Sequence, residues 1–115
     1  MTDREMLELA AKAAGMELDY TIRPDKKAFY HSERNALALV DGGWFAPLTD
    51  DGDALRLAVK LGIEIIPDLQ VNEVLTAFMV GSYGYNTAEE IGTDPLAATR
   101  RAIVRAAAEI GRQMP

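Results

Sequence analysis

The chain has no cysteine and only one histidine and one tryptophan. Without cysteine there are no disulfides, thiolate metal sites or cysteine nucleophiles, a composition that fits a reducing cytosol. No apolar run approaches the ~20 residues that a membrane span needs, so we expect no transmembrane helix. The first eight residues carry three acids rather than the basic start of a secretory signal. Together these features predict a cytoplasmic protein without a membrane partner.

Positive charge is also scarce, and the formal net charge is −6. Residues 1–93 hold eight Lys or Arg against sixteen Asp or Glu, whereas residues 94–115 hold four Arg against Asp94 and Glu109. An acidic body repels a polyanion, so nucleic acid is an unfavourable partner for the surface as a whole. The local excess of arginine near the C-terminal end favours an acidic partner instead.

Start and stop signals predict three helices. These are residues 3–14, capped by Thr2 with Glu5 and ended by Gly15; a helix from about residue 51, capped by the acids at 50–51 and ended by Gly62; and a helix from Pro95, capped by Asp94 and closed by Gly111. For the second helix, we expect the buried face to consist of Leu55, Ala58, Val59 and Leu61.

Short apolar or alternating runs predict strands between the helices. They are residues 18–22, 28–30 (a hairpin partner of 18–22 through residues 23–27), 36–40, 63–66 as a buried strand, and 69–80. Three helices and three to five strands in this order predict one domain over residues 1–115. Its expected class is α+β, with helices packed on a small, mostly antiparallel sheet.

The densest acidic cluster is Asp50-Asp51-Gly52-Asp53. If Gly52 held the glycine position of a calcium loop, the distal glutamate position would fall on Ala58. We therefore interpret these acids as a helix cap that offsets the N-terminal dipole. The sequence predicts neither a metal site nor a cofactor.

The glycine-rich segment Gly81-Ser82-Tyr83-Gly84-Tyr85 matches neither a phosphate loop nor a nucleophile elbow, because it lacks their lysine and their serine spacing. We interpret it as a turn, on which Tyr83 and Tyr85 are candidates for a contact surface.

Two aromatic residues are candidates for other roles. His31 would have to serve any Ser-His-Asp relay, and nothing near it in the sequence supports one, so we place it on the surface. For Trp44 we expect a core role over the junction of sheet and helix.

The last helix carries an arginine stripe of Arg101, Arg105 and Arg112, opposite an apolar face that includes Ile103 and Ala107. The alternatives are a solvated face, a docking face for an acidic protein, or a docking face for phosphates. Arg100 lies at the flank of the apolar face, and we expect it either to snorkel out to solvent or to pair with a carboxylate near the core edge, Asp53 being the candidate.

Two segments carry a family resemblance. Trp44 and Pro47 lead into Asp53-Ala54 and Leu57-Ala58, and the last helix carries Pro95, Leu96, Ala98, Arg101 and Val104. In these segments the chain resembles small, uncharacterised proteins of tailed bacteriophages and prophages, with the phage α-β-α sandwich domain and more distantly the NinX-type accessory proteins. The resemblance implies a layered α-β-α sandwich, a phage or prophage origin and a bacterial host cytoplasm. It implies no reaction.

We therefore hypothesise a non-enzymatic accessory protein that binds another protein through the Arg101/Arg105/Arg112 stripe or the Tyr83–Tyr85 segment. The alternative is a small-ligand binder or an enzyme that uses cleft carboxylates, namely Asp50, Asp51, Asp53 or Glu73. A homodimer is a further expectation, formed by an apolar edge strand that contains Leu75, Phe78 and Val80.

Overall fold

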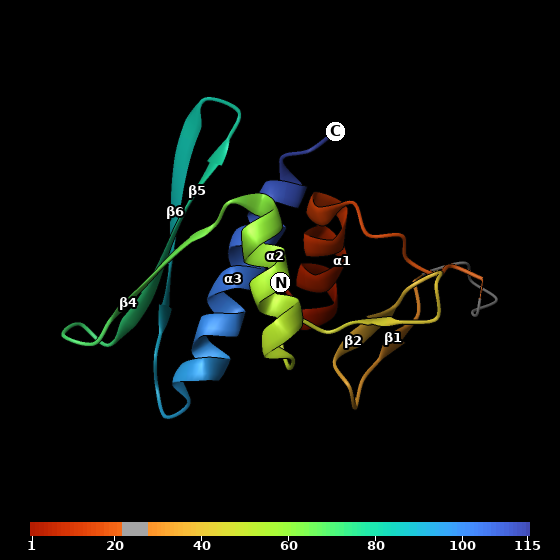
Figure 1. Ribbon diagram of the computed structural model, residues 1–115, viewed down its shortest axis with the longest axis horizontal. Coiled ribbons are helices and arrows are strands. Elements are labelled where there is room, and N and C mark those ends of the chain that lie inside the picture. The colour runs from red at the N-terminus through yellow and green to blue at the C-terminus, as the bar shows by residue number, and fades with distance from the viewer. Residues whose placement is uncertain (22–27) are drawn as a thin grey trace.

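Three helices lie between two small antiparallel sheets in the computed structural model, which describes residues 1–21 and 28–115 (Figure 1). The elements are α1 (Asp3–Ala14), β1 (Tyr30–His31), β2 (Ala36–Ala38), β3 (Trp44–Phe45), α2 (Asp51–Leu61), β4 (Glu64–Asp68), β5 (Glu73–Val80), β6 (Tyr83–Glu90) and α3 (Pro95–Arg112). The principal extents are 48 × 35 × 23 Å. Helix α3 packs on the β4–β5–β6 sheet, and α1 packs on β2.

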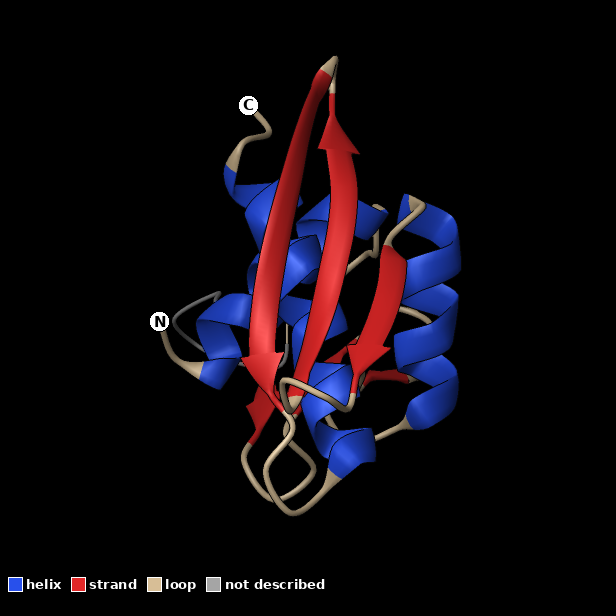
Figure 2. Ribbon diagram, turned by 90° about the vertical axis from the view of Figure 1, so that its left-hand side faces the viewer, coloured by secondary structure: helices blue, strands red, loops and turns tan. Residues whose placement is uncertain are grey.

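The α+β class, the three helices and the antiparallel pairing of strands are confirmed. The order of layers differs from the helix–sheet–helix order that the family resemblance implies. Here the helices form the middle layer, and the β4–β5–β6 sheet turns one face away from them (Figure 2). No helix or strand of the described part of the chain covers that face.

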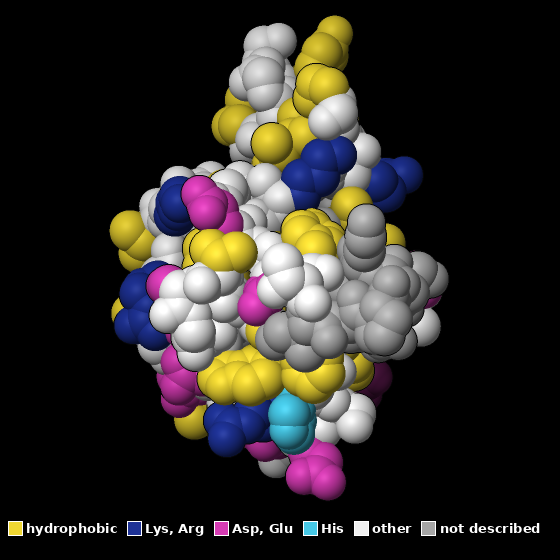
Figure 3. Space-filling view, turned by 90° about the vertical axis from the view of Figure 1, so that its right-hand side faces the viewer, with side chains coloured by type: hydrophobic (Ala, Val, Ile, Leu, Met, Phe, Trp, Pro, Cys, Tyr) yellow, Lys and Arg dark blue, Asp and Glu magenta, His cyan; other side chains and the backbone are white. Residues whose placement is uncertain are grey.

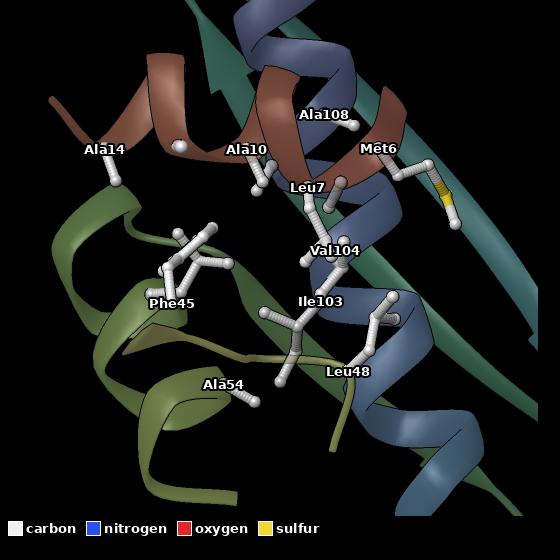
Figure 4. Close-up of a cluster of buried hydrophobic side chains, with 14 of the residues drawn as sticks. Met6, Leu7, Ala10, Ala14, Phe45, Leu48, Ala54, Ile103, Val104 and Ala108 are labelled. Atoms are coloured by element: carbon white, nitrogen blue, oxygen red, sulfur yellow. The ribbon is translucent and has the colours of Figure 1, made fainter. Parts of the chain in front are cut away.

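Helices α1 and α3 make the most extensive helix–helix contact in the fold, through a core that is rich in alanine (Figure 4). The closest approach is at Gly111, where an added Cβ would lie 2.0 Å from the carbonyl oxygen of Leu9. The prediction that Gly111 closes the helix is therefore wrong. Gly111 lies inside α3 and allows the backbones of α1 and α3 to approach each other closely. The C-cap of α3 is Gln113.

The caps predicted for the helices are otherwise confirmed. Thr2, Asp50 and Asp94 each accept a hydrogen bond from a first-turn backbone N–H, and Gly15 and Gly62 adopt the left-handed conformation that ends a helix.

The prediction for the buried face of α2 is correct for Ala58 and wrong for Leu55 and Val59. Its buried side chains are Ala54, Leu57 and Ala58, whereas Leu55 and Val59 are exposed. Positions 54, 57 and 58 form the i, i+3, i+4 stripe that meets α3, so the larger residues one step away point to solvent.

The smaller sheet has the order β1–β2–β3. The strand predicted at 18–22 is wrong over its described part, where only Leu18 forms an isolated bridge, to Leu39. The carboxylate of Asp19 accepts hydrogen bonds from both the backbone N–H and the hydroxyl of Thr21, which bends the chain there. Ile22 and the expected hairpin turn at 23–27 lie outside the described residues, and the observed hairpin joins β1 to β2.

The larger sheet has the order β4–β5–β6, so β5 is its central strand. The prediction of an edge strand around Leu75, Phe78 and Val80 is therefore wrong. The strand predicted from residue 69 begins only at Glu73, because residues 69–72 form a turn with Asn72 at φ 57°.

The outer strands of this sheet also differ from the sequence prediction. The predicted buried strand at 63–66 is the edge strand β4, which runs on to Asp68 through Pro67 and is largely exposed. Proline is tolerated there because an edge strand has unpaired positions. Strand β6 was missed, since Tyr83 and Tyr85 belong to it and only the residues before it form the turn.

In the described part of the chain, no helix combines the length and the apolar character needed to cross a membrane.

Candidate functional site

A groove of about 570 Å³ lies between the start of α1, helix α3 and strand β6, and it contains three of the predicted site residues. They are Arg101, Arg105 and Tyr85, which line it together with Met1, Met6, Asn86, Thr87, Glu89, Ala108 and Glu109. The sequence analysis offered the arginine stripe and the tyrosine segment as alternative surfaces, and the structure places Tyr85 in the same groove as Arg101 and Arg105.

The arginines in and beside this groove already have carboxylate partners. Arg101 forms two hydrogen bonds to Asp3, at 3.1 and 3.4 Å. Arg105 pairs with Glu89, and Arg112 pairs with Glu109. The stripe is therefore a set of internal ion pairs, and an acidic partner would have to compete with these carboxylates.

The pKa values of two carboxyl groups reflect these pairs. The hydrogen bond from Arg101 holds the pKa of Asp3 below its usual value, and Asn35 contributes in the same direction. The hydrogen bond from Arg112 likewise lowers the pKa of Glu109, and Glu109 raises the pKa of Arg112. Both carboxylates are ionised near neutral pH and act as fixed counter-ions rather than as acid–base groups.

The two predicted tyrosines have different environments. Tyr85 stacks on Phe78 with ring centroids 5.8 Å apart, and its hydroxyl donates to Gln113 at 3.0 Å. Tyr83 is 72% exposed at the start of β6, near the tip of the β5–β6 hairpin that projects beyond the helices in Figure 1. Tyr83 is therefore available for contact, whereas Tyr85 helps to fix the sheet on α3.

The acids at the start of α2 are also engaged within the fold. Asp50 caps the helix, and Asp53 accepts from the backbone N–H of Ala46 at 2.8 Å and pairs with Arg56. The predicted pairing of Arg100 with Asp53 is wrong. Arg100 donates instead to Asp51 at 2.7 Å and to the carbonyl oxygen of Leu48 at 2.9 Å.

Two of the four carboxylates of the alternative, ligand-binding hypothesis line hollows, and these hollows are different. Asp53 lines an apolar hollow with Arg56 and Lys60, whereas Glu73 lines another with Glu90 in the large sheet. Within residues 1–21 and 28–115, no group of three or more His, Cys, Asp or Glu side chains is arranged to hold a metal ion.

His31 and Trp44 form an aromatic cluster on the small sheet. His31 is therefore not part of a catalytic relay, and Trp44 does not pack over the junction of sheet and helix. Their rings meet edge to face at 5.5 Å, Phe29 is 6.1 Å from Trp44, and the Arg34 guanidinium lies 5.3 Å from the Trp44 ring. Figure 3 shows the histidine in cyan among hydrophobic and basic side chains. The expected core role of Trp44 is wrong, because β3 leaves it half-buried.

The outer face of the β4–β5–β6 sheet, turned away from α3, was not identified from the sequence. Alternation along the paired strands places on it Glu64, Ile66, Asp68, Glu73, Leu75, Ala77, Met79, Gly84, Asn86, Ala88 and Glu90. At its centre Ile66, Leu75 and Ala88 lie directly opposite one another, and we call them the apolar row. None of the three belongs to the buried core clusters or packs against them.

Two residues further along the strands, Asp68, Glu73 and Glu90 lie opposite one another in a second row, the acidic row. Like charges in directly opposite positions destabilise a sheet. In the described part of the chain, no basic side chain lies within ion-pair distance of these three acids. Glu73, Glu90 and Ala88 border a hollow of about 330 Å³.

A sequence signal for this surface exists. From Leu61 to Thr99 the chain contains no Lys, Arg or His, although it contains Glu64, Asp68, Glu73, Glu89, Glu90 and Asp94. A continuous sheet-forming segment with acids and no bases predicts an acidic sheet. The strand register, which the sequence does not supply, decides which acids share a face.

We found no match to this chain among protein-family models, curated proteins or solved structures.

Proposed function

We propose that this chain is a non-enzymatic binding module that engages another protein through the outer face of the β4–β5–β6 sheet. The observation that carries the proposal is the apolar row, Ile66, Leu75 and Ala88, at the centre of a face that no described element covers. Ile66 is 42% exposed and Met79 is 59% exposed. Contiguous exposed apolar surface that is rimmed by polar groups is a mark of interaction sites.

The charge pattern favours this face over the groove. Arg101, Arg105 and Arg112 have carboxylate partners within the fold. The acidic row has no basic partner among the described residues, although Asp68 accepts hydrogen bonds from the backbone N–H groups of Gln70 and Val71. An accessory role in the cytoplasm of a phage-infected or lysogenic bacterium, which the family resemblance implies, belongs to the same proposal.

A capture experiment with matched variants tests the proposed surface. The Ile66→Thr/Leu75→Thr variant removes two apolar side chains from the outer face, and Leu55→Gln/Val59→Gln removes two exposed ones from α2. We expect wild type and the α2 variant to retain the same protein from a lysogenic host lysate, and the folded outer-face variant to lose it.

Equal retention by both variants, equal loss by both, or no capture by wild type would contradict the proposal. If Arg105→Gln loses the captured protein while the outer-face variant retains it, the binding surface is the groove and not the outer face.

A further inference from the structure

The outer face combines an apolar centre with negative charge on its borders. The acidic row lies two residues, or about 7 Å, from the apolar row along the strands. On the other side of the apolar row, Glu64 is paired with Ala77, which is itself paired with Asn86. A ligand that covers Ile66, Leu75 and Ala88 therefore meets carboxylates at its edges.

We infer that the partner segment is an amphipathic helix whose apolar stripe is bordered by lysine or arginine, an inference that rests on the proposed function above. The acidic row destabilises the isolated sheet, because Glu73 lies directly between Asp68 and Glu90. Cations supplied from outside relieve this repulsion. The hollow bordered by Glu73 and Glu90 gives one such cation a place next to both carboxylates.

A second copy of the same face does not fit this chemistry. Strands β4, β5 and β6 contain no basic residue, so pairing two outer faces would bring acids together without a counter-ion. Size argues in the same direction. Three strands with up to eight residues each outline about 400 Å², whereas a standard interface buries about 800 Å² per partner. The face is the size of a peptide segment.

A helix fits better than an added strand, because features at both edges of the sheet oppose strand addition. Pro67 in β4 has no N–H to donate to a new neighbour. On β6, the side chain of Arg105 donates to the carbonyl oxygen of Ala88 at 3.3 Å. A helix laid on the outer face would instead mirror α3 on the inner face and complete a helix–sheet–helix order of layers.

A synthetic peptide of about 15 residues, with leucine at helical spacing and lysine on both borders, tests the inference. The matched peptide carries glutamate in place of lysine. We expect the lysine peptide to shift the backbone amide resonances of Ile66, Leu75 and Ala88 saturably, and the glutamate peptide to leave them unchanged. Raising the salt concentration from about 0.05 M to about 0.5 M should weaken the binding.

Charge-neutral variants identify the groups responsible. Glu73→Gln/Glu90→Gln should lower the affinity for the lysine peptide about fivefold, which is the effect of losing two exposed ion pairs. The control Glu17→Gln/Glu33→Gln removes the same charge from two exposed positions outside the β4–β5–β6 sheet and should change the affinity by less than about twofold, since separated surface charges are screened.

The inference is overturned if the peptide shifts map to the groove or to α2, if the glutamate peptide binds equally well, or if both double variants lose affinity equally. A different pair of results would separate the two proposals. If Ile66→Thr/Leu75→Thr abolishes partner capture, but Glu73→Gln/Glu90→Gln changes neither partner capture nor the affinity for the lysine peptide, the proposed function stands and the inference about a basic helix fails. Concentration-dependent self-association through the outer face would likewise replace the basic helix with a second copy.

Discussion

The two faces of the β4–β5–β6 sheet are built from alternate residues of the same strands, yet they differ in almost every physical respect. On the inner face of β5, Val74, Thr76 and Phe78 are almost fully buried against the helices. Thr76, the one buried polar side chain among residues 1–21 and 28–115, satisfies its hydroxyl through Thr87 on β6. Inner polar groups are thus matched by partners that the fold itself provides.

On the outer face such matching is incomplete, because Asp68 accepts hydrogen bonds from the backbone N–H groups of Gln70 and Val71, whereas no basic side chain of the described residues pairs with Asp68, Glu73 or Glu90. Ile66, Leu75 and Met79 leave apolar surface in contact with water, and the acidic row places three acidic residues at directly opposite strand positions. Both features oppose the stability of the isolated fold. Their presence on one face, opposite a face whose polar groups are matched, is the basis of our proposal that another molecule binds there.

The largest expected difference between the faces comes from two neighbouring side chains of β5. Phe78→Ala should lower the free energy of unfolding by about 3–5 kcal/mol, because it leaves a cavity under α3. Met79→Ala, on the outer face, should change it by less than about 0.5 kcal/mol. Urea unfolding measures both, and similar losses would show that the outer face is packed against something in the isolated protein.

A pair of glycines sharpens the same comparison. Gly111→Ala should destabilise the fold by about 2 kcal/mol, since the new Cβ collides with the backbone of Leu9 and the gain in helix propensity is smaller. In Gly84→Ala the new Cβ meets only the sulfur of Met79, at 3.6 Å, so we expect a change within about 0.5 kcal/mol. Thermal unfolding of the two variants beside wild type tests the difference, and a neutral Gly111→Ala would refute the close helix contact.

The adjacent acids Glu89 and Glu90 should respond to the same substitution with opposite signs. Glu89 faces inward and pairs with Arg105, so Glu89→Gln should cost about 0.5–1 kcal/mol. Glu90 faces outward opposite Glu73, so Glu90→Gln should stabilise the fold by about 0.3–0.5 kcal/mol. Denaturant titrations at low salt make the contrast largest. Destabilisation by both substitutions would mean that the acidic row is already neutralised.

The smallest expected effect concerns Asp3, whose lowered pKa comes mainly from Arg101. A carboxyl group with a pKa lowered by folding stabilises the folded state above its unfolded pKa of about 3.9, and this contribution is lost as the pH falls through the folded value. Asp3→Asn should therefore cost about 0.5 kcal/mol at pH 7 and almost nothing at strongly acidic pH. Glu5→Gln, in the same helical turn, controls for the helix dipole. A loss that is independent of pH would exclude the ion pair as its cause.

Local signals made the helices predictable from the sequence. Thr2 with Gly15, Asp50 with Gly62, and Asp94 with Pro95 act within a few residues of the backbone groups that they cap, so reading them requires no knowledge of the fold. Gly111 misled the prediction because a glycine needed for close packing has the same appearance in a sequence as a glycine that ends a helix.

Strands were harder to predict because their partners decide which residues a strand tolerates. Strand β6 escaped detection because its inner positions are Tyr85, Thr87 and Glu89, which break the usual apolar alternation. Each of these polar groups has a partner from another element, namely Gln113, Thr76 and Arg105. The arginine stripe was located correctly on α3, but its carboxylate partners lie far away in the sequence.

The acidic row depends on tertiary structure in the same way. Asp68, Glu73 and Glu90 meet only because the β4–β5 and β5–β6 registers align them. The sequence shows the absence of bases from Leu61 to Thr99, but it does not show on which face the acids gather.

The most direct test of the central claim is the free energy of unfolding of wild type and Glu73→Gln/Glu90→Gln, measured with and without the lysine-bordered peptide. Without peptide, the variant should be the more stable protein, because the repulsion in the acidic row is gone. With the same excess of peptide, wild type should gain more stability than the variant, because the stabilisation by a ligand rises with the logarithm of its concentration divided by Kd. A variant that is less stable without peptide, or an equal gain for both proteins, would contradict the account of the outer face as a binding surface for a basic helix.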